Sequence, residues 1–216
     1  MSLWAASLRL LAVTVLVMAA PLTAAAQTTP TVDDAIARMA ADPRSPDAYS
    51  ANVKLHVKLR VFPFISITLH GNTTYKRPGL YHFVFRGVPK VADKFDDLRY
   101  DLGNPLAWRD RYDIAFAPAS TPDVPVLRLT PKTVGGMVSH LDVTIDAQSG
   151  RLLKAVWERH DGGKITLVQT YSSVGSSDIV SHQTANIDIP HMRAELTADY
   201  AGFSVETSTV AGYSAP

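Results

Sequence analysis

The sequence contains no cysteine. Disulfides therefore cannot stabilise the protein, and an exported chain of this composition depends on a buried apolar core. A length of 216 residues is sufficient to form such a core. A bacterial lipoprotein carries its lipid on a cysteine at the cleavage site, so that form of membrane attachment is excluded.

The sequence also lacks an excess of positive or negative charge. The chain has 21 basic and 20 acidic residues and a net charge of +1 at pH 7, and neither sign dominates a long stretch. Because nucleic acids are bound through clustered basic surfaces, we expect no nucleic acid partner. No internal repeat and no low-complexity linker divides the chain, which favours one domain.

The first 26 residues have the pattern of a cleavable secretory signal. Arg9 supplies a positive charge, Leu10–Ala20 is an apolar run of about eleven residues, and Pro21 precedes small residues that end at Ala26. A spanning helix needs about 20 residues, so an uncleaved membrane anchor is the weaker alternative. We expect cleavage near Ala26, leaving one β domain of residues 27–216 in the periplasm, without a lipid anchor.

One helix is predicted near the start of the mature chain. Thr31 and Asp34 have the spacing of a capping box. Apolar residues then recur at helical spacing as far as Met39, and Pro43 and Pro46 end the segment. The helix is short and moderately amphipathic, so we expect it to pack onto a larger surface.

From Tyr49 onward the apolar period changes from 3.6 to 2, which predicts β strands with one apolar and one polar face. The stretch Pro89–Pro125 is less regular, with five prolines and a short helical turn predicted at Phe95–Tyr100. The predicted strands are Val53–Val61, Ile65–His70, Tyr81–Phe85, Tyr112–Phe116, Leu127–Leu129, His140–Ile145, Leu152–Arg159, Lys164–Tyr171, Ile179–Ile189, Arg193–Tyr200 and Phe203–Thr209.

Short turns connect many of these strands, for example Asp146–Gly150 and Asp161–Gly163, so consecutive strands must be antiparallel. The fold class is therefore mainly β. We expect a single curved antiparallel sheet, a half-open β barrel of about ten or eleven strands, with one or more short helices covering its concave face. A two-sheet sandwich is the alternative.

The C-terminal two thirds of the sequence resembles the LolA/LolB-type lipoprotein carrier superfamily. The strand Val126–Lys132, the hairpin formed by His140–Asp146 and Leu152–Trp157, and the strand Ile165–Tyr171 carry the resemblance. The segment Gly71–Pro78 before an aromatic strand agrees with it. The resemblance implies a half-closed antiparallel barrel with a helical lid and an apolar interior that holds lipoprotein acyl chains.

Two features depart from the carrier pattern. Carriers have an aspartate-glycine turn followed by Trp and Tyr in mid-chain, whereas Leu98–Phe116 contains Trp108 and Tyr112 without that turn. Carriers also use an arginine on the lid, for which Arg38 on the predicted helix is the candidate. We therefore expect a relative of the carriers that has the same fold and a different cargo.

Apolar side chains on the inward strand faces are predicted to line the lipid-binding cavity. Inward positions look almost entirely apolar, and a closed, filled core is the alternative, because both have the same sequence pattern. The predicted cavity residues are Val57, Leu59, Ile67, Leu69, Phe83, Phe85, Leu127, Leu129, Val143, Ile145 and Leu167.

No catalytic or metal-binding motif is present. The seven histidines form neither His-x-His nor HExxH, no Gly-x-Ser-x-Gly elbow occurs, and Asp33-Asp34 reads as charge at a helix N-terminus. We expect no enzymatic activity, no metal and no cofactor.

The predicted function is a periplasmic carrier or chaperone that binds lipoprotein acyl chains or a related amphipathic lipid. A membrane-bound donor or acceptor protein is the expected partner. A periplasmic sensor or protein-binding module on the same fold, without catalysis, is the alternative.

Overall fold

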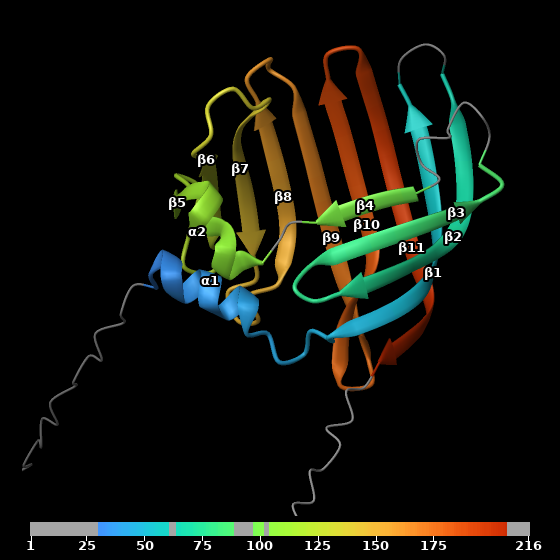
Figure 1. The fold of residues 1–216 in the computed structure, drawn as a ribbon, viewed down its shortest axis with the longest axis horizontal. Helices are drawn as coiled ribbons and strands as arrows, with labels where there is room; N and C mark the ends of the chain where they lie inside the picture. Colours follow the sequence, from blue (N-terminus) through green and yellow to red (C-terminus); the bar gives the residue numbers. More distant parts are fainter. Residues whose placement is uncertain (1–29, 61–63, 89–96, 102–103, 207–216) are drawn as a thin grey trace, which may run out of the picture.

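The computed structural model describes residues 30–60, 64–88, 97–101 and 104–206. The predicted signal peptide and residues 207–209 of the last predicted strand lie outside the described residues. In the described part of the chain, eleven strands form one antiparallel sheet (Figure 1). Its two edge strands do not pair with each other, so the sheet is open. The prediction of a single curved antiparallel sheet is confirmed, and the two-sheet sandwich is not formed.

The sheet has the order β4-β3-β2-β1-β11-β10-β9-β8-β7-β6-β5. Neighbouring strands are therefore consecutive in the chain everywhere except at the junction of β1 with β11, and the consecutive strands β4 and β5 lie at opposite edges of the sheet. The strands are β1 (Ala48–Leu59), β2 (Ser66–Lys76), β3 (Leu80–Arg86), β4 (Asp97–Asp101), β5 (Tyr112–Phe116), β6 (Val126–Pro131), β7 (Val138–Ile145), β8 (Leu152–Arg159), β9 (Lys164–Val174), β10 (Ser177–Ile189) and β11 (Met192–Glu206).

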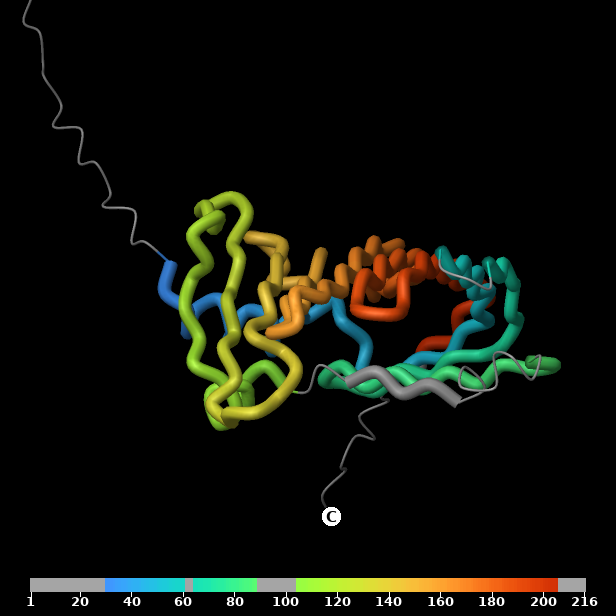
Figure 2. The backbone as a smooth tube through the Cα atoms, turned by 90° about the horizontal axis from the view of Figure 1, so that it is seen from above, coloured from blue at the N-terminus to red at the C-terminus, as the bar shows by residue number. Residues whose placement is uncertain are grey.

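The sheet curves back on itself at its N-terminal end. In Figure 1, β3 runs across the front of β9–β11, and Figure 2 shows the same strands as two layers joined through β1 and β2. This curvature gives the sheet a concave inner face and a convex outer face. The outer positions of β1 carry exposed polar side chains such as Lys54, His56 and Lys58, which explains the clean alternation in the sequence.

Gly71 permits a close approach between β2 and β3. It lies opposite Phe85, and a Cβ atom added to Gly71 would lie 2.2 Å from the carbonyl oxygen of Val84. Any side chain here would separate the two strands, so glycine is required at this position.

The strand register places one row of apolar side chains across the inner face. Side chains of directly opposed residues in an antiparallel pair lie on the same face of the sheet, so each partner extends the row. From β6 to β2 the row consists of Leu127, Val143, Ala155, Leu167, Ala185, Leu196, Val57 and Ile67.

Short helices cover the inner face of the β5–β8 half. They are α1 (Val32–Ala40), the 3-10 turn η2 (Pro105–Ala107) and α2 (Trp108–Arg111). Thr31 caps α1, with its side chain accepting from the Asp34 amide and the Asp34 side chain accepting from the Thr31 amide. The predicted helix, its capping box and its position on the concave face are confirmed.

Two buried clusters divide the core. The first cluster lies between the curved β1–β3 segment and β9–β11, and it contains Tyr49, Val53, Phe83 and Tyr200 among others. The second cluster lies under the helices, where Ile36 and Trp108 pack against side chains of β6–β8.

The predicted helical turn at Phe95–Tyr100 is wrong over its described part. Asp97–Asp101 is strand β4, with Tyr100 opposite Tyr81 of β3. Pairing satisfies the backbone groups on the outer side of β3, which would otherwise form an open sheet edge. That stabilisation depends on a distant partner strand, and a five-residue segment gives no local indication of it.

The last two predicted strands, Arg193–Tyr200 and Phe203–Thr209, form one continuous strand, β11, over their described residues. Gly202 has φ +62°, and the pairing of β1 with β11 shifts register between Ser50 and Asn52. The glycine therefore occupies a β-bulge, which bends a strand without ending it.

Candidate ligand-binding site

An apolar groove lies on the inner face where β3 passes over β9–β11. Its volume is about 140 Å³. Nearly all of its side chains are apolar, with Gln183 and Tyr200 as the exceptions. The residues that line this apolar groove are Val53, Leu55, Phe83, Phe85, Leu167, Gln183, Ala185, Leu196, Ala198 and Tyr200.

The groove results from an uneven distribution of side-chain size. The aromatic rings of Phe83 and Phe85 on β3 are parallel, with centroids 6.3 Å apart. The facing positions on β10 and β11 are the alanines Ala185 and Ala198. The small alanine side chains leave a space below the two rings that the neighbouring Leu167, Leu196 and Tyr200 side chains do not fill.

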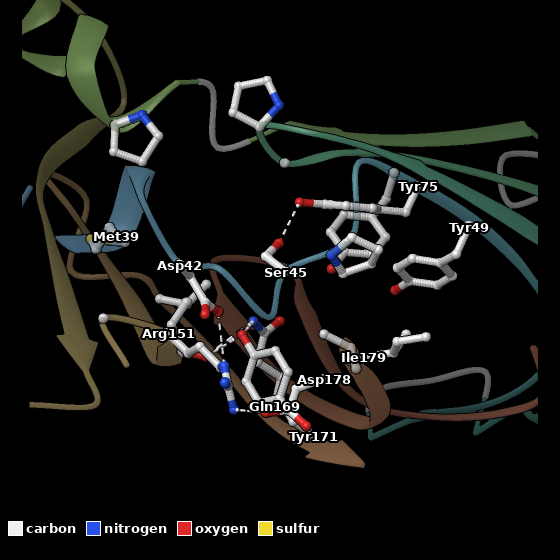
Figure 3. A pocket seen from close by; sticks show the side chains of 18 of the residues that line it. Met39, Asp42, Ser45, Tyr49, Tyr75, Arg151, Gln169, Tyr171, Asp178 and Ile179 are labelled. Atoms are coloured by element: carbon white, nitrogen blue, oxygen red, sulfur yellow. Dashed lines mark hydrogen bonds and ion pairs between the residues drawn. The ribbon is translucent and has the colours of Figure 1, made fainter. Parts of the chain in front are cut away.

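A second, polar cavity lies beside the groove, between the end of α1 and the starts of β1 and β10 (Figure 3). Its volume is about 110 Å³. Polar side chains converge on it from loops and strands that are distant in sequence. The residues that line this polar cavity are Met39, Asp42, Ser45, Pro46, Tyr49, Tyr75, Pro78, Gly79, Tyr81, Pro105, Trp108, Gly150, Arg151, Leu152, Gln169, Tyr171, Asp178, Ile179 and Val180.

The charged side chains of the polar cavity are paired. Arg151 Nε lies 2.9 Å from Asp42 Oδ2, and its Nη1 lies 2.6 Å from Asp178 Oδ2. Arg44 also contacts Asp178, at 2.7 Å. The side chains of Asp42 and Asp178 are only 6% and 7% exposed, so these carboxylates require the arginines for compensation.

A chain of buried hydrogen bonds connects the groove to the cavity. The Tyr200 hydroxyl donates to Gln183 Oε1, and Gln183 Nε2 donates to Gln169 Oε1 at 2.9 Å. Gln169 Nε2 then donates to the Leu152 carbonyl at 3.0 Å and to the Tyr171 hydroxyl at 2.6 Å. Gln183 lines the apolar groove and Gln169 lines the polar cavity, so this chain forms part of the boundary between them.

Tyr49 differs from these side chains because its hydroxyl is buried without a hydrogen bond of normal geometry among the described residues. Its ring stacks on Tyr75 with centroids 5.0 Å apart, and Figure 3 shows its hydroxyl directed into the polar cavity. Burial raises the pKa of Tyr49, an effect that the nearby Tyr81 hydroxyl partly opposes. The hydroxyl therefore remains protonated and available as a donor.

The structure brings all the predicted cavity residues to the inner face, but in two different surroundings. Phe83, Phe85 and Leu167 line the apolar groove. Four others pack in the first cluster with Phe83 and Phe85 but do not line the groove; they are Val57, Leu59, Ile67 and Leu69. Contact of this set with a ligand remains a prediction.

The remaining predicted residues lie in the second cluster, beneath α1 and Trp108. They are Leu127, Leu129, Val143 and Ile145, each at most 1% exposed. The first three are surrounded by protein side chains, as in a filled core, whereas Ile145 also lines a separate cavity of about 190 Å³ together with Ala35 and Arg38 of α1. Arg38 is exposed on α1 and donates to the Ala147 carbonyl in the β7–β8 turn, away from the groove. Its action as a lid residue remains a prediction.

The sequence analysis missed the polar side chains of the inner face. Its expectation of almost entirely apolar inward positions is wrong at Gln169 and Gln183, which are 5% and 8% exposed. The alternation contained a signal, because Gln169 is in phase with the inward residues Leu167 and Tyr171. The pairing of Arg151 with two distant aspartates had no comparable signal.

Among the residues that the structure describes, no helix is long and apolar enough to cross a membrane. Within the same part of the chain, no three histidine, aspartate or glutamate side chains come together in a way that could hold a metal ion.

No protein-family model matches the chain, and no curated protein matches it by sequence. Solved structures do match. A DUF1329 family protein from Desulfovibrio piger aligns over 81% of this chain and 92% of its own, with 13% identity and a TM-score of 0.58. A LolA superfamily protein from Nitrosomonas europaea aligns over 82% of this chain and 94% of its own, with 11% identity and a TM-score of 0.53.

The chain has a LolA-like fold. A third structure, described as an outer membrane lipoprotein-sorting protein domain from Vibrio parahaemolyticus, aligns over 82% of this chain and 91% of its own, with 11% identity and a TM-score of 0.52. The family resemblance inferred from the sequence is thus confirmed at the level of the fold. At these identities the LolA-like fold alone does not define the cargo, which has to be argued from the groove and the cavity.

Proposed function

We propose that this protein is a periplasmic carrier that binds an acyl chain of a lipoprotein, or of a related amphipathic lipid, in the apolar groove. The observation that carries the proposal is the groove itself, with phenylalanines on one side and alanines on the other. Burial of an acyl chain contributes about 0.8 kcal/mol per methylene, so shielding from water suffices for binding. Release to a membrane-bound acceptor then requires no bond to be broken.

The size of the groove limits how much of a chain it holds without rearrangement. Its volume of 140 Å³ is close to that of an apolar cavity, about 150 Å³, that accommodates benzene. A few methylene groups fit in this space. A longer chain needs β3, with Phe83 and Phe85, to move away from β10 and β11.

Filling the groove tests the proposal. Ala185→Leu adds a larger side chain between β3 and β10, whereas Thr184→Leu places the same side chain on the outer face of the same strand. Uptake of a fluorescent fatty-acid probe is expected to weaken at least tenfold in Ala185→Leu and to remain unchanged in Thr184→Leu. Circular dichroism and thermal unfolding establish that both variants are folded.

Native mass spectrometry of the mature protein from a periplasmic extract, followed by lipid extraction, gives an independent test. Copurified acyl lipid at about one per chain supports the carrier. A protein that is empty and also fails to take up the probe contradicts it, and favours the alternative of a protein-binding module on the same fold.

A further inference from the structure

We infer that the polar cavity binds the head group of the same ligand, and that it selects uncharged amphiphiles with hydroxyl, ester or amide heads over lipids with carboxylate or phosphate heads. This inference rests on the proposed function, because it requires the chain of the ligand to occupy the apolar groove. Beyond the carrier function, it specifies the chemical class of the head group of the cargo.

The groove and the cavity are close enough for one ligand to occupy both. On β3, Tyr81 lines the polar cavity, and Phe83, two residues further along, lines the groove. Two residues of a strand span about 7 Å. On the opposite side, Gln169 and Gln183 are directly paired, and each lines one of the two spaces. An amphiphile with its chain in the groove therefore has its head at the polar cavity.

The charges around the polar cavity disfavour an anionic head group. Arg151 is paired with two buried carboxylates, Asp42 and Asp178. An anion placed beside Arg151 would also lie beside these carboxylates, and like charges at short range repel in a partly buried site. The surrounding groups are balanced as well, since Arg44 pairs with Asp178 and Arg77 with Asp47. Among the described residues of this site, each arginine already has a carboxylate partner.

The tyrosine hydroxyls of the cavity can bind a head group, whereas the arginines are already paired with carboxylates. The Tyr49 hydroxyl is directed into the cavity, and its residue is only 3% exposed (Figure 3). A buried donor without an acceptor is unfavourable, and a carbonyl or hydroxyl oxygen of a ligand would satisfy it. Burial raises the pKa of Tyr75 and Tyr171, so these side chains also present hydroxyl groups rather than phenolates.

A displacement experiment with three ligands of equal chain length tests the inference. The mature protein is loaded with the uncharged dye N-phenyl-naphthylamine at pH 7.5 and titrated with monododecanoylglycerol, dodecanoate or dodecyl phosphate. Monododecanoylglycerol is expected to bind at least tenfold more tightly than either anion. Tyr49→Phe, shown by circular dichroism to be folded, is expected to lose most of this preference.

Tyr112→Phe is the matched control, because Tyr112 packs with the second cluster, away from the cavity. It should retain the preference of the native protein. Equal or tighter binding of dodecanoate or dodecyl phosphate would overturn the inference and leave the carrier function standing. An unchanged preference in a folded Tyr49→Phe variant would overturn the assignment of Tyr49. If neither the dye nor any lipid binds, the proposed function itself fails.

Discussion

Gln169 on β9 lies directly opposite Gln183 on β10, and the Gln183 side-chain amide donates a 2.9 Å hydrogen bond to Gln169 Oε1. Both side chains are buried on the inner face of a sheet that is otherwise apolar at most inward positions. The pair connects further, to Tyr200 on one side and to Tyr171 on the other. This chain of polar side chains thus lies where the apolar groove adjoins the polar cavity.

Removal of both members of this pair should cost less than the sum of the two single removals. Gln183→Leu leaves Gln169 Oε1 and the Tyr200 hydroxyl without their partner, and we expect a loss of about 1–3 kcal/mol in the free energy of unfolding. The double variant Gln169→Leu/Gln183→Leu should lose less than the sum of the single losses, because opposed leucines leave fewer unpaired groups. Urea unfolding of the four proteins measures this coupling; strictly additive losses would contradict it.

Gly71→Ala tests the close approach of β2 and β3. The added Cβ would lie 2.2 Å from the Val84 carbonyl oxygen, so the strands must separate, at an expected cost of about 1–3 kcal/mol in the free energy of unfolding. Gly136→Ala is the control, because no atom lies within 4 Å of a Cβ at that position. Equal stability of the two variants in urea would show that the contact has no such effect.

A leucine of the filled core and a leucine that lines the groove should respond differently to the same substitution. Leu129 is 0% exposed in the second cluster, so Leu129→Ala is expected to cost about 2–5 kcal/mol and leave the dissociation constant of the lipid unchanged. Leu167→Ala alters a residue of the groove and should weaken lipid binding severalfold. Titrations at a temperature where both variants are folded compare them. A ligand effect confined to Leu129→Ala would show that the binding site lies under α1.

Affinity should rise with chain length only until the groove is filled. For a series of uncharged alkyl alcohols, each buried methylene contributes about 0.8 kcal/mol, or roughly a fourfold tighter dissociation constant. The groove volume of 140 Å³ accommodates only a few methylenes, so the gain should become smaller for longer chains. Isothermal titration calorimetry across the series measures the slope. A dissociation constant independent of chain length from the shortest member onward would contradict burial in the groove.

The β8–β9 turn should make stability sensitive to strong acid. The Arg159 guanidinium, assisted by the Gly163 amide, lowers the pKa of Asp161 to about 2. Because the folded-state pKa lies below the value of 3.8 in the absence of these contacts, the stabilisation is present above pH 3.8 and is lost as the pH falls toward 2. Carboxyl chemical shifts followed by NMR give the pKa directly.

Asp161→Asn should remove that part of the acid dependence in urea unfolding between pH 5 and pH 2. Asp113→Asn, at an exposed position of β5, is the control and should keep it. A native-like pH dependence in Asp161→Asn would mean that the acid sensitivity of the fold comes from other carboxylates.

The sequence predicted the elements whose stabilisation is local. Alternation in β1 and β7 is visible because their outer side chains are polar, and the capping box of α1 is contained in four consecutive residues. Strand β4 was missed because it is defined by pairing with β3, and the bulge at Gly202 because a glycine in a strand also resembles a turn.

The candidate site was only partly predictable for a related reason. Alternation identifies which side chains of a strand point inward, and it placed Phe83 and Leu129 on the same face. It does not show what covers that face. β3 leaves a groove beside Phe83, whereas α1 and Trp108 fill the space over Leu129. Phe83 and Leu129 therefore share the same local sequence pattern but differ in their surroundings, because elements distant in sequence cover them differently.

The pairing of β1 with β11 has a consequence for the order of folding. All other strand pairs join neighbours in the chain, whereas Val53 and Tyr200 are opposed although they come from nearly opposite ends of the described residues. Contacts between neighbouring strands close short loops and form early, and the β1–β11 contact closes the longest loop. Until β11 has been synthesised, β1 and β10 each expose an unpaired edge, and such edges promote association between chains. The protein is therefore most vulnerable to aggregation until β11 has paired with β1 and β10.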